Sequence, residues 1–192
     1  GISKMNKKKI LLLSISLVFL LTASAGAEDS RVLQCRVLAR DFMTELKGEL
    51  KRGIRGGGMV RAISVCRKTA PELAARYSLP PSVQIGRISE RWRNPENRPD
   101  SWEQEGLVIF EKRRLQGETM AGMEYWQEIE EEGERFFRYL RAIPTGSLCL
   151  RCHGEKISRK LKKALQKNYP EDHAVGFRLG ELRGAFTIIL SQ

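Results

Sequence analysis

Residues 149–153 read Cys-Leu-Arg-Cys-His, and this C-x-x-C-H spacing constrains the fold more than any other feature of the chain. It places two thiols about one helical turn apart, with an imidazole directly after the second. The pattern is the attachment signature of c-type haem, in which two thioethers hold the porphyrin and the histidine ligates the iron. The sequence therefore predicts that Cys149, Cys152 and His153 hold one covalently attached haem c.

Other uses of this motif are less favoured by the sequence. A zinc site needs a fourth ligand, and a histidine adjacent to Cys152 is poorly placed to act as an independent zinc ligand. A redox C-x-x-C usually opens a helix after a strand of a βαβ unit, and no such unit is apparent. A structural disulfide between Cys149 and Cys152 would close a tight, strained loop. Covalent haem remains the favoured interpretation.

The N-terminal residues have the order of an export signal. Lysines at positions 7–9 precede an apolar run over residues 10–21, and small residues follow up to Ala-Gly-Ala at 25–27. This order predicts a cleavable secretory signal in residues 1–27, which also contain upstream sequence before Met5. An uncleaved membrane anchor is the alternative, although the apolar run is shorter than the ~20 residues that span a bilayer. We expect a periplasmic protein whose single domain covers residues 28–192.

Composition narrows the class of protein. With 41% hydrophobic and 30% charged residues among 192, the chain resembles neither a disordered polymer nor a multi-span membrane protein. The formal net charge is +11, of which +7 lies in residues 28–192. Because no nucleic-acid-binding fold is recognisable and an export signal is expected, we do not expect nucleic-acid binding. Contact with a membrane is expected only if the signal segment stays uncleaved.

Hydrophobic periodicity predicts helices first and then a mostly antiparallel sheet, which is the α+β class. A long N-terminal helix over residues 30–50 should end at glycines 53 and 56–58, and a second helix should follow from residue 59. Further helices are expected over residues 101–116, with Ser101 as N-cap, and over 157–168. Predicted strands cover residues 83–88, 123–130, 134–143, 174–179 and 182–190.

The second axial ligand of the iron is not determined by these patterns. A thiol, an imidazole or a thioether could ligate the iron. A thiolate ligand would lower the redox potential, whereas a methionine ligand would raise it. Cys66 could equally be a buried apolar residue or a disulfide partner of Cys35. The candidates are Cys66, Cys35, His173, Met43, Met59, Met120 and Met123.

Two groups of basic residues could also contribute. Arg87, Arg91 and Arg93 surround an Asn-Pro loop, and an arginine there could bind a haem propionate through charge-assisted hydrogen bonds, with Arg87 favoured. Lys160, Lys162 and Lys163 form a basic patch that could steer an acidic redox partner. Solvated surface charge is the alternative for both groups.

Several ordered segments resemble the bacterial PAS-like c-type haem domains, a family long catalogued as a domain of unknown function. Its members occur alone in the periplasm or as the sensory part of membrane-bound signalling proteins. The segments are Ala-Ile-Ser-Val-Cys at 62–66 with Ala-Pro at 70–71, residues 85–89, 93–99 with 102–103, Pro144 ahead of 149–154, 169–172 with 176–177, and 180–185.

The resemblance implies a PAS-like fold, with a central antiparallel sheet and flanking helices. It implies that Cys149, Cys152 and His153 hold the haem and that Cys66 matches the family's second axial ligand. The expected protein is therefore a monohaem c-type cytochrome, not an enzyme, acting in low-potential electron transfer or redox sensing with an unknown redox or signalling protein partner. The alternatives are a gas sensor that binds NO or CO through a partner protein and, less favoured, a small haem peroxidase or reductase.

Overall fold

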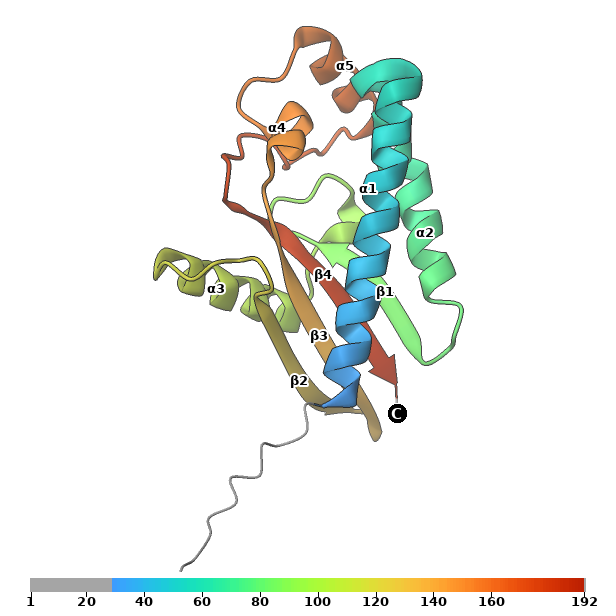
Figure 1. Ribbon diagram of the computed structural model, residues 1–192, viewed down its shortest axis with the longest axis vertical. Coiled ribbons are helices and arrows are strands. Elements are labelled where there is room, and N and C mark those ends of the chain that lie inside the picture. Colours follow the sequence, from blue (N-terminus) through green and yellow to red (C-terminus); the bar gives the residue numbers. More distant parts are fainter. Residues whose placement is uncertain (1–28, 192) are drawn as a thin grey trace, which may run out of the picture.

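A computed structural model describes residues 29–191, so the predicted signal segment lies outside the described residues. Its centre is a four-stranded antiparallel sheet in the order β1-β4-β3-β2 (Figure 1). The strands are β1 (Val83–Ile88), β2 (Glu124–Glu131), β3 (Glu134–Pro144) and β4 (Leu182–Ser191). The helices are α1 (Ser30–Ser64), α2 (Ala70–Tyr77), α3 (Ser101–Leu115), α4 (Ser147–His153) and α5 (Arg159–Asn168). The predicted α+β class, with its antiparallel sheet and long N-terminal helix, is confirmed.

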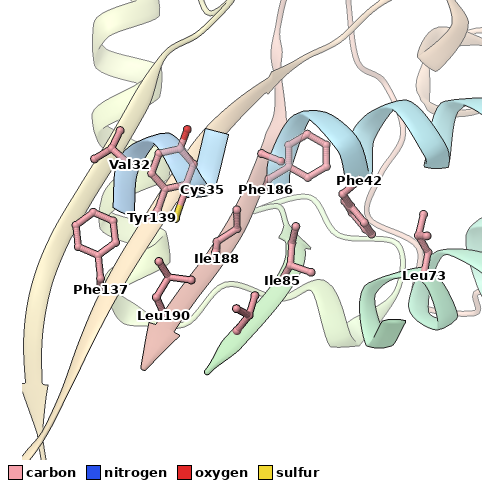
Figure 2. Close-up of a cluster of buried hydrophobic side chains, with 12 residues drawn as sticks. Val32, Cys35, Phe42, Leu73, Ile85, Phe137, Tyr139, Phe186, Ile188 and Leu190 are labelled. Carbon is pink, nitrogen blue, oxygen red and sulfur yellow. The ribbon is translucent and has the colours of Figure 1, made fainter. Parts of the chain in front are cut away.

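Helices cover both faces of the sheet, because successive strand side chains point to opposite sides. On β3, Phe137 and Tyr139 pack under α1, whereas Leu140 packs with Leu107 and Phe110 of α3. Figure 2 shows the face of the sheet that α1 covers, where side chains of α1 lie over those of β3 and β4. The residues shown there include Val32, Cys35, Phe42, Phe137, Tyr139, Phe186, Ile188 and Leu190.

Helix α1 kinks near its C-terminal end. Gly57 and Gly58 are the residues inside it with non-helical backbone, and Gly58 has the positive φ of +72° that favours glycine. The chain then returns, so that a Cβ on Gly53 would lie 2.8 Å from a methyl of Val65. The predicted break is therefore real, although it occurs at residues 57–58 and leaves Gly53 inside the helix.

Two further predictions of local structure are wrong. The N-cap of α3 is Asp100, whose carboxylate accepts from the N–H of Glu103 while the Glu103 carboxylate accepts from the N–H of Asp100. The segment 174–179 is not a strand and has only an isolated bridge between Phe177 and Gly154. The carbonyl of Ala174 accepts side-chain hydrogen bonds from His153 and Arg93, so it is not available to a strand ladder.

A third cluster of apolar side chains lies beyond the sheet. Ile63, near the end of α1, packs with Leu161 and Leu165 of α5 and with Tyr169, and Cys152 of α4 lies against this cluster. The ends of α1, α4 and α5 therefore form one compact unit at one end of the sheet (Figure 1). In residues 29–191 no helix combines the length and apolar character required to cross a membrane.

Candidate functional site

A largely apolar pocket lies between this end of the sheet and the α1–α4–α5 unit. The pocket is open to solvent, and the space between its walls, with the solvent at its mouth included, is about 1180 Å³. Apolar residues of α1 form much of its wall, among them Leu46, Leu50 and Ile54. All five predicted site residues line this single pocket: Cys66, Arg87, Cys149, Cys152 and His153.

The C-x-x-C-H motif forms helix α4, which begins after Gly146 and ends at His153. The helical backbone places Cys149 and Cys152 three residues apart, so both thiols can face the same pocket. Both thiols are free and half-buried. Burial raises the pKa of Cys152, which the nearby Arg93 partly offsets. The predicted pair of attachment thiols is thus brought together on one helical turn.

The imidazole of His153 is oriented by a backbone carbonyl. Its Nδ1 lies 2.8 Å from the carbonyl oxygen of Ala174, and because a carbonyl can only accept, Nδ1 carries the hydrogen. Burial lowers the pKa of His153 well below 6.5, and the positive charges of Arg183 and Arg93 lower it further. The ring is therefore neutral at pH 7, with Nε2 available as a metal ligand.

Arg93 fastens the end of α4 to the segment that follows α5. Its Nε donates to Asp172 at 2.9 Å, and one terminal nitrogen donates to the carbonyls of Cys152 at 2.7 Å and Ala174 at 3.0 Å. Asp172 in turn accepts from the N–H of Ala174. The guanidinium and its carboxylate are both nearly buried, with about a tenth of each side chain exposed. Arg93 therefore positions the carbonyl that orients His153.

The three arginines of the Asn-Pro loop have different environments. Arg91 lies over the ring of Phe177 at 3.5 Å and donates to the carbonyl of Val175, whereas Arg93 is used in the contacts above. Arg87 lines the pocket, and no hydrogen bond joins its side chain to any residue in 29–191. Of the three, Arg87 is the one available to a ligand.

Another arginine of the pocket, Arg183, was not predicted from the sequence. Its Nη1 donates to the hydroxyl of Ser89 at 3.0 Å, and the side chain lines the pocket. Burial, together with the charges of Arg87 and Arg93, lowers the pKa of Arg183 to about 10, and burial also lowers that of Arg87. Two guanidiniums in an apolar pocket are costly unless an anion compensates them. The pairing of β1 with β4 brings Arg87 and Arg183 together. Their distance apart in the sequence therefore could not predict that they share a pocket.

The candidates for a second axial ligand divide into those that line the pocket and those that lie elsewhere. Cys66, Met43 and Met59 line the pocket. Cys35 is fully buried in the first core cluster, between α1 and the sheet, and burial raises the pKa of its thiol to about 12. His173 is exposed against Trp92, at 4.4 Å between ring centroids. Met120 and Met123 belong to the core on the α3 side of the sheet.

Cys66 lies in an irregular segment between α1 and α2. Residues Val65–Thr69 form a π-helical turn, η1, and such turns are enriched at functional sites because they widen the helix and redirect side chains. Val65 is buried beneath this turn and Cys66 is half-buried at the pocket. Of the three candidates that line the pocket, Cys66 is the one that lies on a π-helical turn.

The donor set of the pocket fits a haem. It offers paired thiols, a neutral imidazole, a third thiol on another element, two guanidiniums for two carboxylates, and apolar walls. Within residues 29–191 no group of three or more His, Cys, Asp or Glu side chains is arranged to bind a bare metal ion. The fold and pocket define an α+β protein with a four-stranded antiparallel sheet and a C-x-x-C-H helix facing an arginine-lined cavity.

The chain belongs to the Tll0287-like family, whose family model matches residues 21–191. The predicted family resemblance is confirmed by this match. Among solved structures, the cyanobacterial haem protein Tll0287 is similar, with a TM-score of 0.65 and 22% sequence identity. The similarity covers 86% of this chain and 98% of that protein. No curated protein sequence matches the chain.

Proposed function

We propose that this protein is a periplasmic monohaem c-type cytochrome that acts in low-potential electron transfer or redox sensing. Cys149 and Cys152 would hold the haem through thioethers, and His153 and Cys66 would ligate its iron. Haem bound here supplies one-electron exchange between ferric and ferrous iron. The observation that carries the proposal is the C-x-x-C-H helix beside the pocket: Nδ1 of His153 is bonded to Ala174, and Nε2 has no hydrogen-bond partner in residues 29–191.

The chain's own residues account for the expected properties. The Ala174 carbonyl holds the imidazole of His153 in one orientation and makes Nε2 a better donor. A thiolate at Cys66 favours ferric iron and so lowers the potential. Arg87 and Arg183 would supply positive charge for two propionates, and the apolar wall would contact the porphyrin. The similar solved protein, Tll0287, is a haem protein, which supports the same proposal.

An absorption spectrum of protein exported by cells that mature c-type cytochromes tests the proposal. We expect a sharp α-band after reduction with dithionite and colour that stays with the protein through acid–acetone extraction, because thioethers resist extraction. A colourless protein from competent cells would contradict the proposal.

Binding of carbon monoxide distinguishes a carrier from a gas sensor. If Cys66 and His153 both stay bound to ferrous iron, the reduced spectrum does not change under CO at neutral pH. If Cys66 leaves on reduction, CO shifts the Soret band, and the sensor alternative is favoured. Turnover of peroxide with a reducing dye, above the rate of free haem, would instead favour the peroxidase alternative.

A further inference from the structure

The two ends of the molecule carry opposite charge. Residues 46–68 contain seven Lys or Arg and one Glu, and residues 147–169 contain the same numbers. Residues 124–134 contain six Glu and neither Lys nor Arg. The end of α1 lies with α4 and α5 at one end of the long axis, and the hairpin joining β2 and β3 lies at the other (Figure 1). Arg31 and Arg36 of α1 pair with Glu128 and Glu124 of the hairpin, so the excess negative charge of this end lies at the hairpin tip, in residues 130–134. The positive end of the molecule surrounds the pocket.

The positive charge at this end is concentrated on α5 and beside the pocket. We define the basic surface as Arg159, Lys160, Lys162, Lys163 and Lys167 of α5 together with Lys47 of α1. All six side chains are exposed, and none forms an ion pair with a residue in 29–191. Lys47 also lines the pocket, as does Leu165 from the buried side of α5. Both α5 and Lys47 therefore border the pocket.

We propose that the basic surface is the docking site for an acidic protein that exchanges electrons with the pocket. This inference rests on the proposed haem function. A cluster of positive charge at one end raises the rate of encounter with an anionic partner. The acidic hairpin tip at the far end is repelled by the same partner, so the molecule approaches it with the pocket facing the partner. Docking at this end places the partner next to the site where the electron enters or leaves.

The same surface is a poor match for a lipid bilayer. Basic helices that bind membranes present Trp, Phe or Leu beside their cations and insert them below the headgroups. On α5 the large apolar residues Leu161 and Leu165 point inward and are less than 5% exposed. The helix therefore offers charge without an apolar face, as expected for a surface that binds a protein reversibly.

Poly-L-glutamate, a polyanion with protein chemistry, is a suitable probe. Calorimetric titration of the holoprotein at low ionic strength should show binding that weakens as salt is added. The variant K160E/K163E should bind at least about tenfold more weakly, because two reversed charges repel the probe. The matched control K112E/R135E makes the same change in net charge on exposed residues of α3 and β3, and its affinity should fall less than about twofold.

Electron exchange is measured separately with ferricyanide, a trianion that accepts one electron from the ferrous protein. Oxidation of K160E/K163E should be at least about tenfold slower than that of the control variant at low salt. Equal effects of both variants, in either assay, would overturn the proposal. Tighter binding to phosphatidylglycerol vesicles or duplex DNA than to poly-L-glutamate would overturn it as well. A colourless protein whose poly-L-glutamate binding still depends on Lys160 and Lys163 would refute the haem function and leave the surface intact.

Discussion

Cys35 and Cys66 lie on consecutive elements of one chain and show two ways of burying a thiol. Cys35 lies in a dry core between α1 and the sheet, where burial raises the pKa of its thiol to about 12. Cys66 lies on a π-helical turn at the rim of a pocket that also holds two unneutralised guanidiniums. The first environment favours stability, whereas the second keeps the guanidinium of Arg87 without a hydrogen-bond partner in residues 29–191 and available to a ligand.

This contrast extends to the regions around the two cysteines. Around Cys35, buried polar groups are paired: the Tyr139 hydroxyl donates to Glu124 at 2.6 Å, and Arg36 bonds both oxygens of that carboxylate. Around Cys66, Arg87 has no hydrogen-bond partner in residues 29–191, and Arg183 has a lowered pKa. We call the region around Cys35, between α1 and the sheet, the sheet end, and the region around Cys66 the pocket end. We conclude that the sheet end stabilises the fold and that the charged groups of the pocket end are available to a ligand.

The largest effect should come from removing both attachment thiols. C149S/C152S should lose all covalently attached haem, because no thioether can form, and haem staining after denaturing electrophoresis will measure this. The control C35S should keep full staining and lose only stability in the core. Retained staining in the double variant would contradict the proposed attachment.

Replacing the proposed axial thiol should change the iron without releasing it. We expect C66A to keep its thioether-linked haem and to change from a low-spin to a high-spin ferric spectrum, since alanine offers no ligand. Absorption and electron paramagnetic resonance spectra measure the spin state. M59A is the matched control at the same pocket and should leave it unchanged; the reverse pattern would make Met59 the ligand.

At the sheet end, F42A should destabilise the fold without changing the site. Phe42 is fully buried and makes edge-to-face contacts with Tyr77 and Phe186, at 5.6 and 5.7 Å between ring centroids. Truncation should lower the free energy of unfolding by about 3–5 kcal/mol, measured by denaturant titration. An altered haem spectrum in the folded variant would show that the two regions are coupled.

R183Q should lower the redox potential. A positive charge in the pocket would favour ferrous iron there, so its removal should shift the midpoint by about −60 mV, a tenfold change in a one-electron equilibrium. Spectroelectrochemical titration measures the shift. R135Q removes an exposed charge from β3 and should have little effect. An equal shift in both variants would mean that Arg183 does not act locally.

The smallest expected effect is a change in acid sensitivity at the sheet end. Burial alone would raise the pKa of Glu124, but hydrogen bonds from Arg36 and Tyr139 outweigh it and lower the pKa below 4.5. The stability that the ionised carboxylate contributes is present above pH 4.5 and is lost as the pH falls below that value. E124Q should therefore show a shallower decline in unfolding free energy over this range. A decline as steep as that of the unchanged protein would exclude Glu124 as its source.

Much of the fold could be predicted because its signals are local. Alternating apolar residues located β1, β2, β3 and β4 to within a few residues, and helical periodicity located α1, α3 and α5. One failure came from contacts that are not local in sequence. The segment 174–179 has a strand-like pattern, but its backbone is held by the side chains of His153 and Arg93 from distant parts of the chain.

The sequence by itself predicted covalent haem attachment, because the spacing of Cys149, Cys152 and His153 is set within one helical turn. It also determined the distribution of charge along the chain. Only the tertiary structure decided that Arg183 joins Arg87, that Arg93 holds the Ala174 carbonyl against His153, and that Cys66 faces the pocket while Cys35 does not. The physical reason is that these relationships depend on strand pairing and helix packing between residues far apart in sequence, which no local spacing encodes.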